Sequence, residues 1–266
     1  MMPTAPSALD YVDEIVAEMG ARRLVVFLDY DGTLTPIVSR PEKAVLSNST
    51  RQTLQKLAAQ APVTILSGRD LEDIRHRVGI GGIVYAGSHG FDIAGPRGLR
   101  KEIATDFLSI LEAAGRELKE RLAGIPGALV EWKRFSIAAH YRQANENAAA
   151  KVQRAVNKVA AQHPQLRLLV GKKVYELQPD IDWNKGKALL WLLEMISSEP
   201  REIFPIYVGD DLTDEDAFRV IKQCGLGIVV SEEPRPTAAR YALKTPAEVD
   251  RFLHKIVARL PTNAAS

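Results

Sequence analysis

The chain has 266 residues, of which 46% are hydrophobic and 26% charged, a composition that is typical of soluble globular proteins and argues against disorder along the whole length. Its net charge of +2 comes without any stretch dominated by Lys and Arg, so neither nucleic acid nor a membrane is expected as a partner. The one cysteine, Cys224, excludes a disulfide framework within the chain. No secretory signal and no run of roughly 20 apolar residues is apparent, and we therefore expect cytoplasmic residence.

Apolar runs and a helical pattern alternate in the first part of the chain. The runs at residues 24–28, 63–66 and 83–86 each end at a small or polar residue, and a helical pattern occupies residues 49–59. Because the apolar positions are continuous rather than alternating, these runs predict strands that are covered on both faces, as in a mostly parallel sheet.

The middle of the chain, residues 97–179, departs from this plan. Its patterns predict two helices and two pairs of strands in the order α-β-β-α-β-β: residues 105–122, 128–132, 135–141, 145–162, 166–170 and 174–177. Turn residues gather at Gly95-Pro96 and near Pro179. We therefore expect a smaller α+β module inserted between these points.

Strands and helices alternate again in the last part of the chain. The predicted elements are helices at 187–196, 214–222 and 247–260 and strands at 206–208 and 226–230. Together with the first part, they predict an α/β fold with a doubly wound, mostly parallel, Rossmann-like sheet. The core of this fold would comprise residues 1–96 and 180–266, with residues 97–179 as the insert.

Reactive side chains follow three of the predicted strands. Asp29 and Asp31 come after the first strand, Ser67 after the second, and Asp210 and Asp211 after the strand at 206–208. Ligands of open α/β sheets bind beyond the carboxyl ends of the strands, so we expect these groups to gather in one crevice. Taken singly, an acidic turn, a capping serine and an acidic helix start would explain them without any function.

Four carboxylates in one crevice would repel one another strongly: Asp29, Asp31, Asp210 and Asp211. Such a cluster must be partly protonated or hold a cation. Every candidate ligand is an oxygen, with no partner His or Cys, which favours a hard ion, and Mg²⁺ fits best. Lys185 would bring positive charge to a phosphate, because the glycine behind it lets the backbone approach closely. The combination predicts phosphoryl chemistry in which one carboxylate attacks phosphorus and another transfers protons.

Four motifs in chain order resemble those of the haloacid dehalogenase-like phosphatases: Asp29-Tyr-Asp-Gly-Thr33, Ser67-Gly-Arg69, Lys185-Gly-Lys-Ala-Leu189 and Gly209-Asp-Asp-Leu-Thr-Asp-Glu-Asp216. More narrowly, the segments 28–36, 85–93, 131–133 and 140–142 are similar to trehalose-6-phosphate phosphatases. The resemblance covers nearly the whole chain after residue 20, and the insert resembles the α/β cap that gives this superfamily its substrate specificity.

The resemblance implies a role for each catalytic group. Asp29 would be the nucleophile that becomes the aspartyl phosphate. Asp31 would protonate the leaving sugar oxygen and then take a proton from water, with a raised pKa for which the crowded acidic site supplies a reason. Ser67 would hydrogen-bond a phosphoryl oxygen, and Lys185 would neutralise the charge that builds up during transfer.

The resemblance also implies the metal ligands. Mg²⁺ would be held by the carboxylate of Asp29, the backbone carbonyl of Asp31 and Asp210. Asp211 and Asp214 would either ligate through water or orient the lysine, and the sequence leaves this choice open.

Substrate recognition is implied chiefly for the cap. The resemblance suggests Glu131, Lys133, Arg142 and Glu176 as contacts for the sugar hydroxyls, since a hydroxyl can donate to a carboxylate and accept from a cation. It also assigns Gly32 to substrate binding. The expected reaction is hydrolysis of trehalose 6-phosphate to trehalose and phosphate by a monomer whose partner is this small sugar phosphate.

Other functions stay open at this point. A related phosphatase could act on sucrose, glucosylglycerol or mannosylglycerate phosphates, and phosphomutase activity is less expected. A rival of another class is a non-catalytic sugar-phosphate sensor, although a sensor has no need for both Asp29 and Asp31. A dinucleotide-binding protein is disfavoured because no Gly-x-Gly-x-x-Gly follows the first strand.

Overall fold

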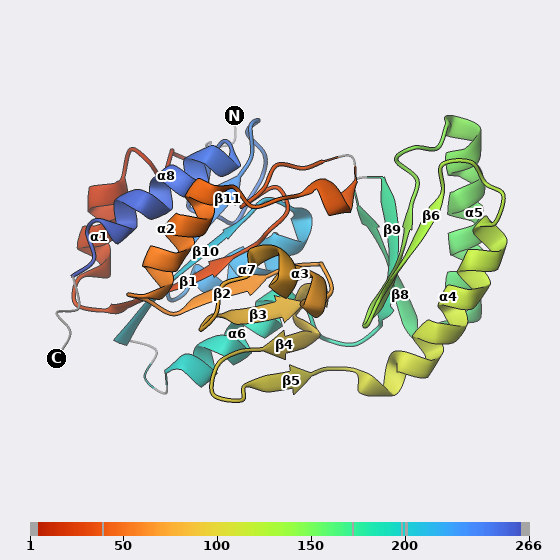
Figure 1. Ribbon diagram of the computed structural model, residues 1–266, viewed down its shortest axis with the longest axis horizontal. Helices are drawn as coiled ribbons and strands as arrows, with labels where there is room; N and C mark the ends of the chain where they lie inside the picture. The colour runs from red at the N-terminus through yellow and green to blue at the C-terminus, as the bar shows by residue number, and fades with distance from the viewer. Residues whose placement is uncertain (1–4, 39, 172, 198, 200–201, 262–266) are drawn as a thin grey trace. The chain divides into compact units, whose positions relative to one another are not determined.

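The computed structural model describes residues 5–38, 40–171, 173–197, 199 and 202–261 (Figure 1). The chain divides into two compact units, residues 1–100 with 183–266 and residues 101–182. The sequence predicted an insert at residues 97–179, and the roles of catalytic core and cap stay predictions.

The first unit is built around an eight-stranded sheet in the order β12-β11-β10-β1-β2-β3-β4-β5. Its strands are β1 (Arg23–Leu28), β2 (Val63–Leu66), β3 (Val84–Gly87), β4 (Asp92–Ala94), β5 (Arg100–Glu102), β10 (Ile203–Gly209), β11 (Leu226–Val230) and β12 (Tyr241–Leu243). From β12 to β3 all neighbouring strands pair in parallel, and β4 pairs antiparallel with β3.

Strand β1 illustrates how both faces of this sheet are covered. Leu24, Val26 and Leu28 belong to one buried hydrophobic cluster, whereas Val25 and Phe27 belong to another. The first cluster includes residues of α1 (Val12–Met19), α2 (Asn48–Ala58), α3 (Leu71–Val78) and α8 (Pro246–Val257), and the second includes residues of α6 (Lys185–Ile196) and α7 (Glu215–Ile221). Helices on both faces of a mostly parallel sheet confirm the predicted doubly wound α/β fold.

Polar residues and a glycine set the ends of several helices. Ser47 and Thr245 each accept a hydrogen bond from a backbone amide in the first turn of α2 and α8, and Pro246 begins α8, where its missing amide hydrogen costs nothing. Helix α3 ends at Gly79, whose φ of 61° is a left-handed conformation that glycine adopts readily.

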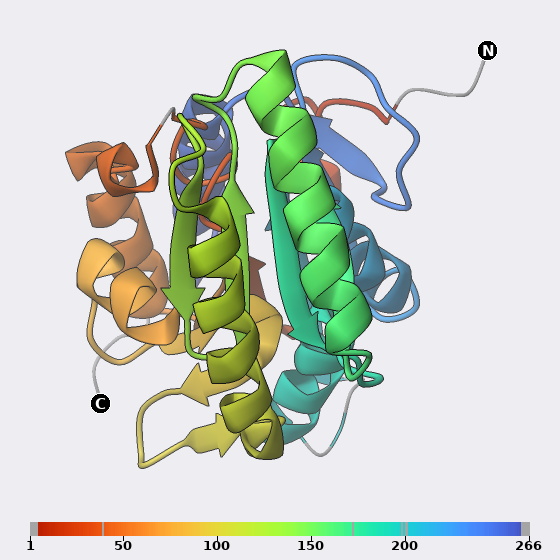
Figure 2. The ribbon, with the colours of Figure 1, turned by 90° about the vertical axis from the view of Figure 1, so that its right-hand side faces the viewer.

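The second unit is a smaller α+β module, as predicted. Its antiparallel sheet has the order β6-β7-β9-β8: β6 (Leu129–Lys133), β7 (Ser136–His140), β9 (Val174–Pro179) and β8 (Leu166–Gly171). Helices α4 (Leu108–Leu122) and α5 (Glu146–Gln162) lie side by side against this sheet and share a buried cluster with it (Figure 2).

The sequence missed several short elements. Strands β4, β5 and β12 have three residues each, too few to produce a recognisable apolar run. Helices α1 and α3 have eight residues each and were also missed, although α7, with seven residues, lies within the predicted helix at 214–222. No helix in the described part of the chain has both the length and the apolar character needed to cross a membrane.

Candidate active site

Three adjacent strands of the first unit end in predicted catalytic groups. Asp29 follows β1, Ser67 follows β2 and Asp210 follows β10. Because β1 pairs in parallel with both β2 and β10, the three strand ends lie at the same edge of the sheet.

The turn after β1 brings Gly32 against Asp210. Backbone hydrogen bonds close this turn: the amides of Leu34 and Thr35 donate to the carbonyl of Tyr30 over 2.9 and 3.0 Å. Gly32 has a φ of 79°, and a Cβ atom there would lie 2.1 Å from Oδ2 of Asp210. Only glycine fits this position without displacing the carboxylate.

A buried lysine links two of the carboxylates at this edge. The Nζ atom of Lys185 donates to Oδ1 of Asp29 over 2.8 Å and to Oδ1 of Asp214 over 2.7 Å, and the three side chains are 3%, 7% and 0% exposed. Lys185 is the first residue of α6. The side chain of Asn184 accepts a hydrogen bond from the amide of Lys187 and so fixes the start of this helix. Lys187 is exposed.

Asp214 is saturated with hydrogen bonds. Besides Lys185, its Oδ1 accepts from the hydroxyl of Tyr207 over 2.5 Å. Its Oδ2 accepts from the amides of Asp210 and Asp211 over 3.0 and 2.9 Å. Asp214 therefore holds both the lysine and the loop after β10 in place, which favours the orienting role among the two that the sequence left open for it.

The electrostatics of the buried groups follow from their surroundings. Burial raises the pKa of Asp29 well above its ordinary value; the ammonium of Lys185 opposes this rise, and the carboxylates of Asp214 and Asp210 add to it. For Lys185, burial works against the charged form, but the carboxylates of Asp214 and Asp29 hold its pKa well above the ordinary value. Lys185 therefore stays positively charged.

The donor set at this edge fits a hard divalent cation. Oxygen atoms of Asp29, Asp210 and Asp214 lie within 4.8 Å of one another, and the single charge of Lys185, which bridges Asp29 and Asp214, cannot balance three carboxylates. All donors are oxygens, which Mg²⁺ prefers. The four hydrogen bonds that Asp214 accepts leave Asp29 and Asp210 with more free acceptor capacity for an ion.

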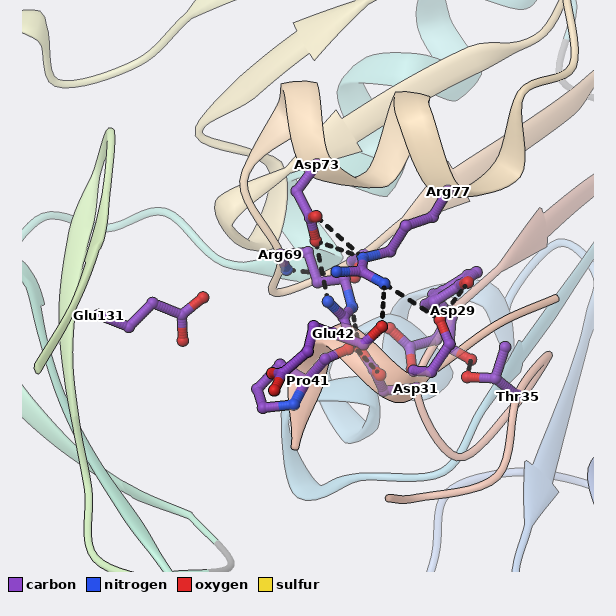
Figure 3. A network of polar contacts seen from close by, with 12 residues as sticks. Asp29, Asp31, Thr35, Pro41, Glu42, Arg69, Asp73, Arg77 and Glu131 are labelled. Carbon is purple, nitrogen blue, oxygen red and sulfur yellow. Dashed lines mark hydrogen bonds and ion pairs between the residues drawn. The ribbon is translucent and has the colours of Figure 1, made fainter. Parts of the chain in front are cut away.

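The carboxylate of Asp31 points to a different partner. It receives two hydrogen bonds from the guanidinium of Arg69, from Nε to Oδ2 over 2.6 Å and from Nη2 to Oδ1 over 2.7 Å (Figure 3). Ser67, 1% exposed, lies at the end of β2, and its Oγ accepts from the amide of Arg69 over 3.2 Å.

The close cluster of carboxylates does not consist of the four residues that the sequence predicted. The close cluster contains Asp214 in place of Asp31 and Asp211. Asp31 lies in the turn beyond β1, where its carboxylate pairs with the guanidinium of Arg69. The Oδ1 atom of Asp211 accepts from the amide of Leu212 and starts the short 3₁₀ helix Leu212–Asp214.

Three of the four predicted sugar contacts lie together on the second unit. Glu131 and Glu176 are both in register with Ala138 of β7 and so share one face of the sheet. Lys133 donates to Oε1 of Glu176 over 3.0 Å. Arg142 lies in the turn after β7 with an exposed side chain.

Two further polar residues complete this face, and the sequence assigned them no role. Ser136 donates to Oε1 of Glu176 over 2.5 Å, and Nε2 of His140 lies 2.6 Å from Oε2 of Glu131. Burial works against ionisation of Glu131, but the hydrogen bond with His140 and the charge of Lys133 hold its pKa below the ordinary value. The face therefore presents a carboxylate that stays charged.

Sequence reasoning also missed Tyr207 and gave Arg69 no role. Tyr207 is part of the continuous apolar run of β10, so nothing in the pattern marks its hydroxyl as functional. Arg69 stands two residues after Ser67 in the Ser67-Gly-Arg69 motif, and a cation just beyond a strand end was the available signal.

Comparisons with known proteins agree with this geometry. The family model described as trehalose-phosphatase matches residues 27–247. The trehalose-phosphate phosphatase of Mycobacterium tuberculosis (strain H37Rv) is 44% identical over 265 residues, which cover 97% of this chain and 66% of the relative. A probable trehalose-phosphate phosphatase H of Arabidopsis thaliana is 42% identical over 268 residues, covering 95% of this chain and 77% of the relative.

A solved structure supports the fold. The C-terminal domain of C. albicans trehalose-6-phosphate phosphatase aligns with a TM-score of 0.82, covering 97% of this chain and 99% of that chain at 22% identity, which shows the fold alone. Of the mycobacterial relative, the chain spans slightly less than two thirds of the length. The family assignment rests on the sequence matches. By these matches, the chain belongs to the trehalose-phosphatase family.

Proposed function

We propose that this chain is a Mg²⁺-dependent phosphomonoesterase that hydrolyses trehalose 6-phosphate to trehalose and phosphate through an aspartyl phosphate on Asp29. The observation that carries the proposal is the buried ammonium of Lys185 between Asp29 and Asp214 at the carboxyl edge of the sheet. The trehalose-phosphate phosphatases at 42–44% identity support the choice of substrate.

The reaction begins with a carboxylate oxygen of Asp29 attacking phosphorus. The phosphorus–oxygen bond to the sugar breaks, and Asp31, which takes up a proton when the substrate binds, gives this proton to the departing sugar oxygen. A water molecule then attacks the phosphorus of the aspartyl phosphate, Asp31 takes one proton from this water, and phosphate leaves with Asp29 restored. The two half-reactions return both carboxylates to their starting states.

Two groups stabilise the transferring phosphoryl group. The hydroxyl of Ser67 can donate to a phosphoryl oxygen, because its own oxygen accepts from the amide of Arg69 and its hydrogen stays available. The ammonium of Lys185 is held in place before the substrate arrives, so it costs no rearrangement when negative charge develops.

Asp29, Asp210 and the backbone carbonyl of Asp31 are the proposed holders of Mg²⁺. When bound there, the ion would polarise the phosphoryl group and screen its charge from the carboxylates. Gly32 leaves room for the side chain of Asp210 beside the turn. Its amide donates to the carbonyl of Thr35 over 2.7 Å, so the proposed role of Gly32 in substrate binding is to let the phosphate approach a turn that carries no side chain there.

Sugar recognition is proposed for the polar face of the second unit. Glu131, Lys133 and Glu176 are already ordered by hydrogen bonds among themselves, Ser136 and His140, so little side-chain freedom is lost when a sugar binds. Arg142 is proposed as a further contact. Monomeric state and cytoplasmic residence stay predictions.

Phosphate release from a panel of sugar phosphates, with Mg²⁺ and then with excess chelator, tests the proposal. We expect strong preference for trehalose 6-phosphate and complete loss of turnover with chelator. Equal turnover of many sugar phosphates would keep the mechanism and contradict the substrate. Asp29→Asn is the matched control, because it should bind trehalose 6-phosphate without turnover; a wild-type protein that binds but never turns over would instead be a sensor.

A further inference from the structure

Arg69 is a buried cation at the centre of a polar network that connects four segments of the first unit. Its side chain is 9% exposed although it carries a full charge. It lies at the end of β2, between the carboxylates of Asp31 in the turn after β1 and Asp73 in α3 (Figure 3). A buried guanidinium is tolerated only when its hydrogen-bond donors are paired. The acceptors around Arg69 are therefore a defined part of the fold.

The pairing with Asp31 uses both oxygens of the carboxylate. The two bonds of 2.6 and 2.7 Å form the parallel fork that only arginine can make, and they fix the plane of the carboxylate as well as its distance. Each oxygen of Asp31 keeps a second lone pair, so a proton can still be exchanged there.

Other contacts prevent the guanidinium from following Asp31 if that carboxylate moves. Nη1 of Arg69 donates to Asp73 over 2.8 Å, Nη2 also donates to the carbonyl of Pro41 over 2.8 Å, and the guanidinium lies over the ring of Tyr30, 5.4 Å from its centroid. The backbone of Arg69 is held as well, since its carbonyl accepts from the amide of Ser88 over 2.7 Å.

A second arginine holds the far side of the network. Nε of Arg77 donates to both oxygens of Asp73 over 2.9 and 2.8 Å. Its Nη1 donates to the carbonyls of Glu42 and Ala44, each over 3.2 Å. Arg77 therefore supports Asp73 and the segment at 42–44, whereas none of these hydrogen bonds goes to Asp31.

We propose that Arg69 is a positioning residue that fixes the carboxylate of Asp31 in the place from which it exchanges protons with the leaving group and with water. This inference rests on the proposed function, because it takes Asp31 as the general acid and base. It goes beyond that function because it gives Arg69 the role of placing the acid. Arg69 contacts Asp31 and is not itself required to touch substrate.

A change of leaving group separates this role from a structural one. A sugar oxygen needs a proton as it departs, whereas 4-nitrophenolate departs unprotonated, and both substrates need the base when water attacks the intermediate. In Arg69→Gln we expect kcat for trehalose 6-phosphate to fall about 100-fold or more with KM nearly unchanged. With 4-nitrophenyl phosphate we expect a rapid first release of about one nitrophenolate per enzyme, followed by slow turnover, in a stopped-flow trace.

Matched variants keep the test decisive. Arg77→Gln disturbs the same Asp73 without touching Asp31, so it should lower stability and affect the two substrates in equal proportion. Arg69→Lys keeps the charge and loses the fork, and its kcat for trehalose 6-phosphate should lie between those of wild type and Arg69→Gln. If Arg69→Gln does not fold, two other experiments carry the test. One is the lysine variant, and the other is Arg69→Ala, in which added ethylguanidine should restore turnover.

The outcomes distinguish this inference from the function on which it rests. Equal losses for both substrates in the Arg69 variants, without a rapid first release, would overturn the positioning role. If Asp31→Asn loses turnover of trehalose 6-phosphate while Arg69→Gln retains it, only the positioning role fails. If Asp31→Asn retains turnover, or wild type hydrolyses neither substrate, the proposed function fails and takes this inference with it.

Discussion

The ammonium of Lys185 lies 2.8 Å from a carboxylate oxygen of Asp29, although 156 residues separate them in the chain. Lys185→Met should lower kcat by about 100- to 1000-fold, because the charge that stabilises the transferring phosphoryl group is lost. It should also lower the free energy of unfolding by about 3–5 kcal/mol, since the carboxylates of Asp29 and Asp214 stay buried without their partner. Phosphate release and urea unfolding measure the two effects.

A second substitution tells whether the lost stability comes from uncompensated charge. Asp214→Asn in the Lys185→Met background should recover part of the unfolding free energy without restoring turnover. The new amide can still accept from the backbone amides of Asp210 and Asp211 through its oxygen. No recovery of stability in the double variant would show that burial of charge is not the cause.

Gly186 sets the distance between α6 and α7. A Cβ atom at this position would lie 2.7 Å from the carbonyl oxygen of Asp216, which is backbone and cannot turn away. Gly186→Ala should therefore push the helices apart and lower the free energy of unfolding by about 1–3 kcal/mol, measured by urea unfolding. Gly81→Ala is the control, because a Cβ there meets nothing within 4 Å and stability should be nearly unchanged.

The pairing of Asp73 makes part of the stability depend on pH. Partial burial works against its ionisation, but hydrogen bonds from Arg77 and Arg69 hold its pKa below the ordinary value of 3.8. A lowered pKa in the folded state means that the stabilisation is complete well above pH 3.8 and is lost as pH falls through the lower folded value. The difference in unfolding free energy between wild type and Asp73→Asn should be constant near neutral pH and shrink below about pH 4. A difference that grows on acidification would contradict this sign.

Glu176 tests the polar face of the second unit. Glu176→Gln keeps the shape and removes the charge that orders Lys133 and Ser136. We expect KM for trehalose 6-phosphate to rise about 10-fold with kcat little changed, and no change for 4-nitrophenyl phosphate, which has no sugar. The matched control is Glu112→Gln, an exposed carboxylate of α4 paired with Arg116, which should affect neither substrate. Equal effects of both variants would exclude a role in sugar binding.

The sequence predicted the buried strands of the core well and the directions of side chains poorly. The predicted ranges 63–66 and 226–230 coincide with β2 and β11, because a fully buried strand leaves an unbroken apolar run between turn residues. Strand β12 was missed since its three residues, Tyr241–Leu243, form no such run. Local patterns thus reveal elements long enough to show a period.

The candidate site shows the same limit at the level of single residues. Strand ends were enough to predict that Asp29 and Asp210 lie at one edge, and the motif with a glycine after Lys185 was enough to predict that this lysine joins them. They could not predict that Asp31 pairs with Arg69, because the partner comes from another strand and the direction of a side chain in a turn depends on that contact. Nor could they predict that Asp214 is saturated, since two of its donors are backbone amides that no pattern marks.

The most direct test of the central claim is to look for phosphate on Asp29. The protein would be mixed with trehalose 6-phosphate and Mg²⁺, quenched in acid within the first turnovers, digested, and analysed by mass spectrometry, because acyl phosphates survive acid. We predict a phosphorylated peptide that contains Asp29, and none from Asp29→Asn treated in the same way. Turnover of trehalose 6-phosphate with phosphate on a different residue, or undiminished turnover by Asp29→Asn, would contradict the proposed mechanism.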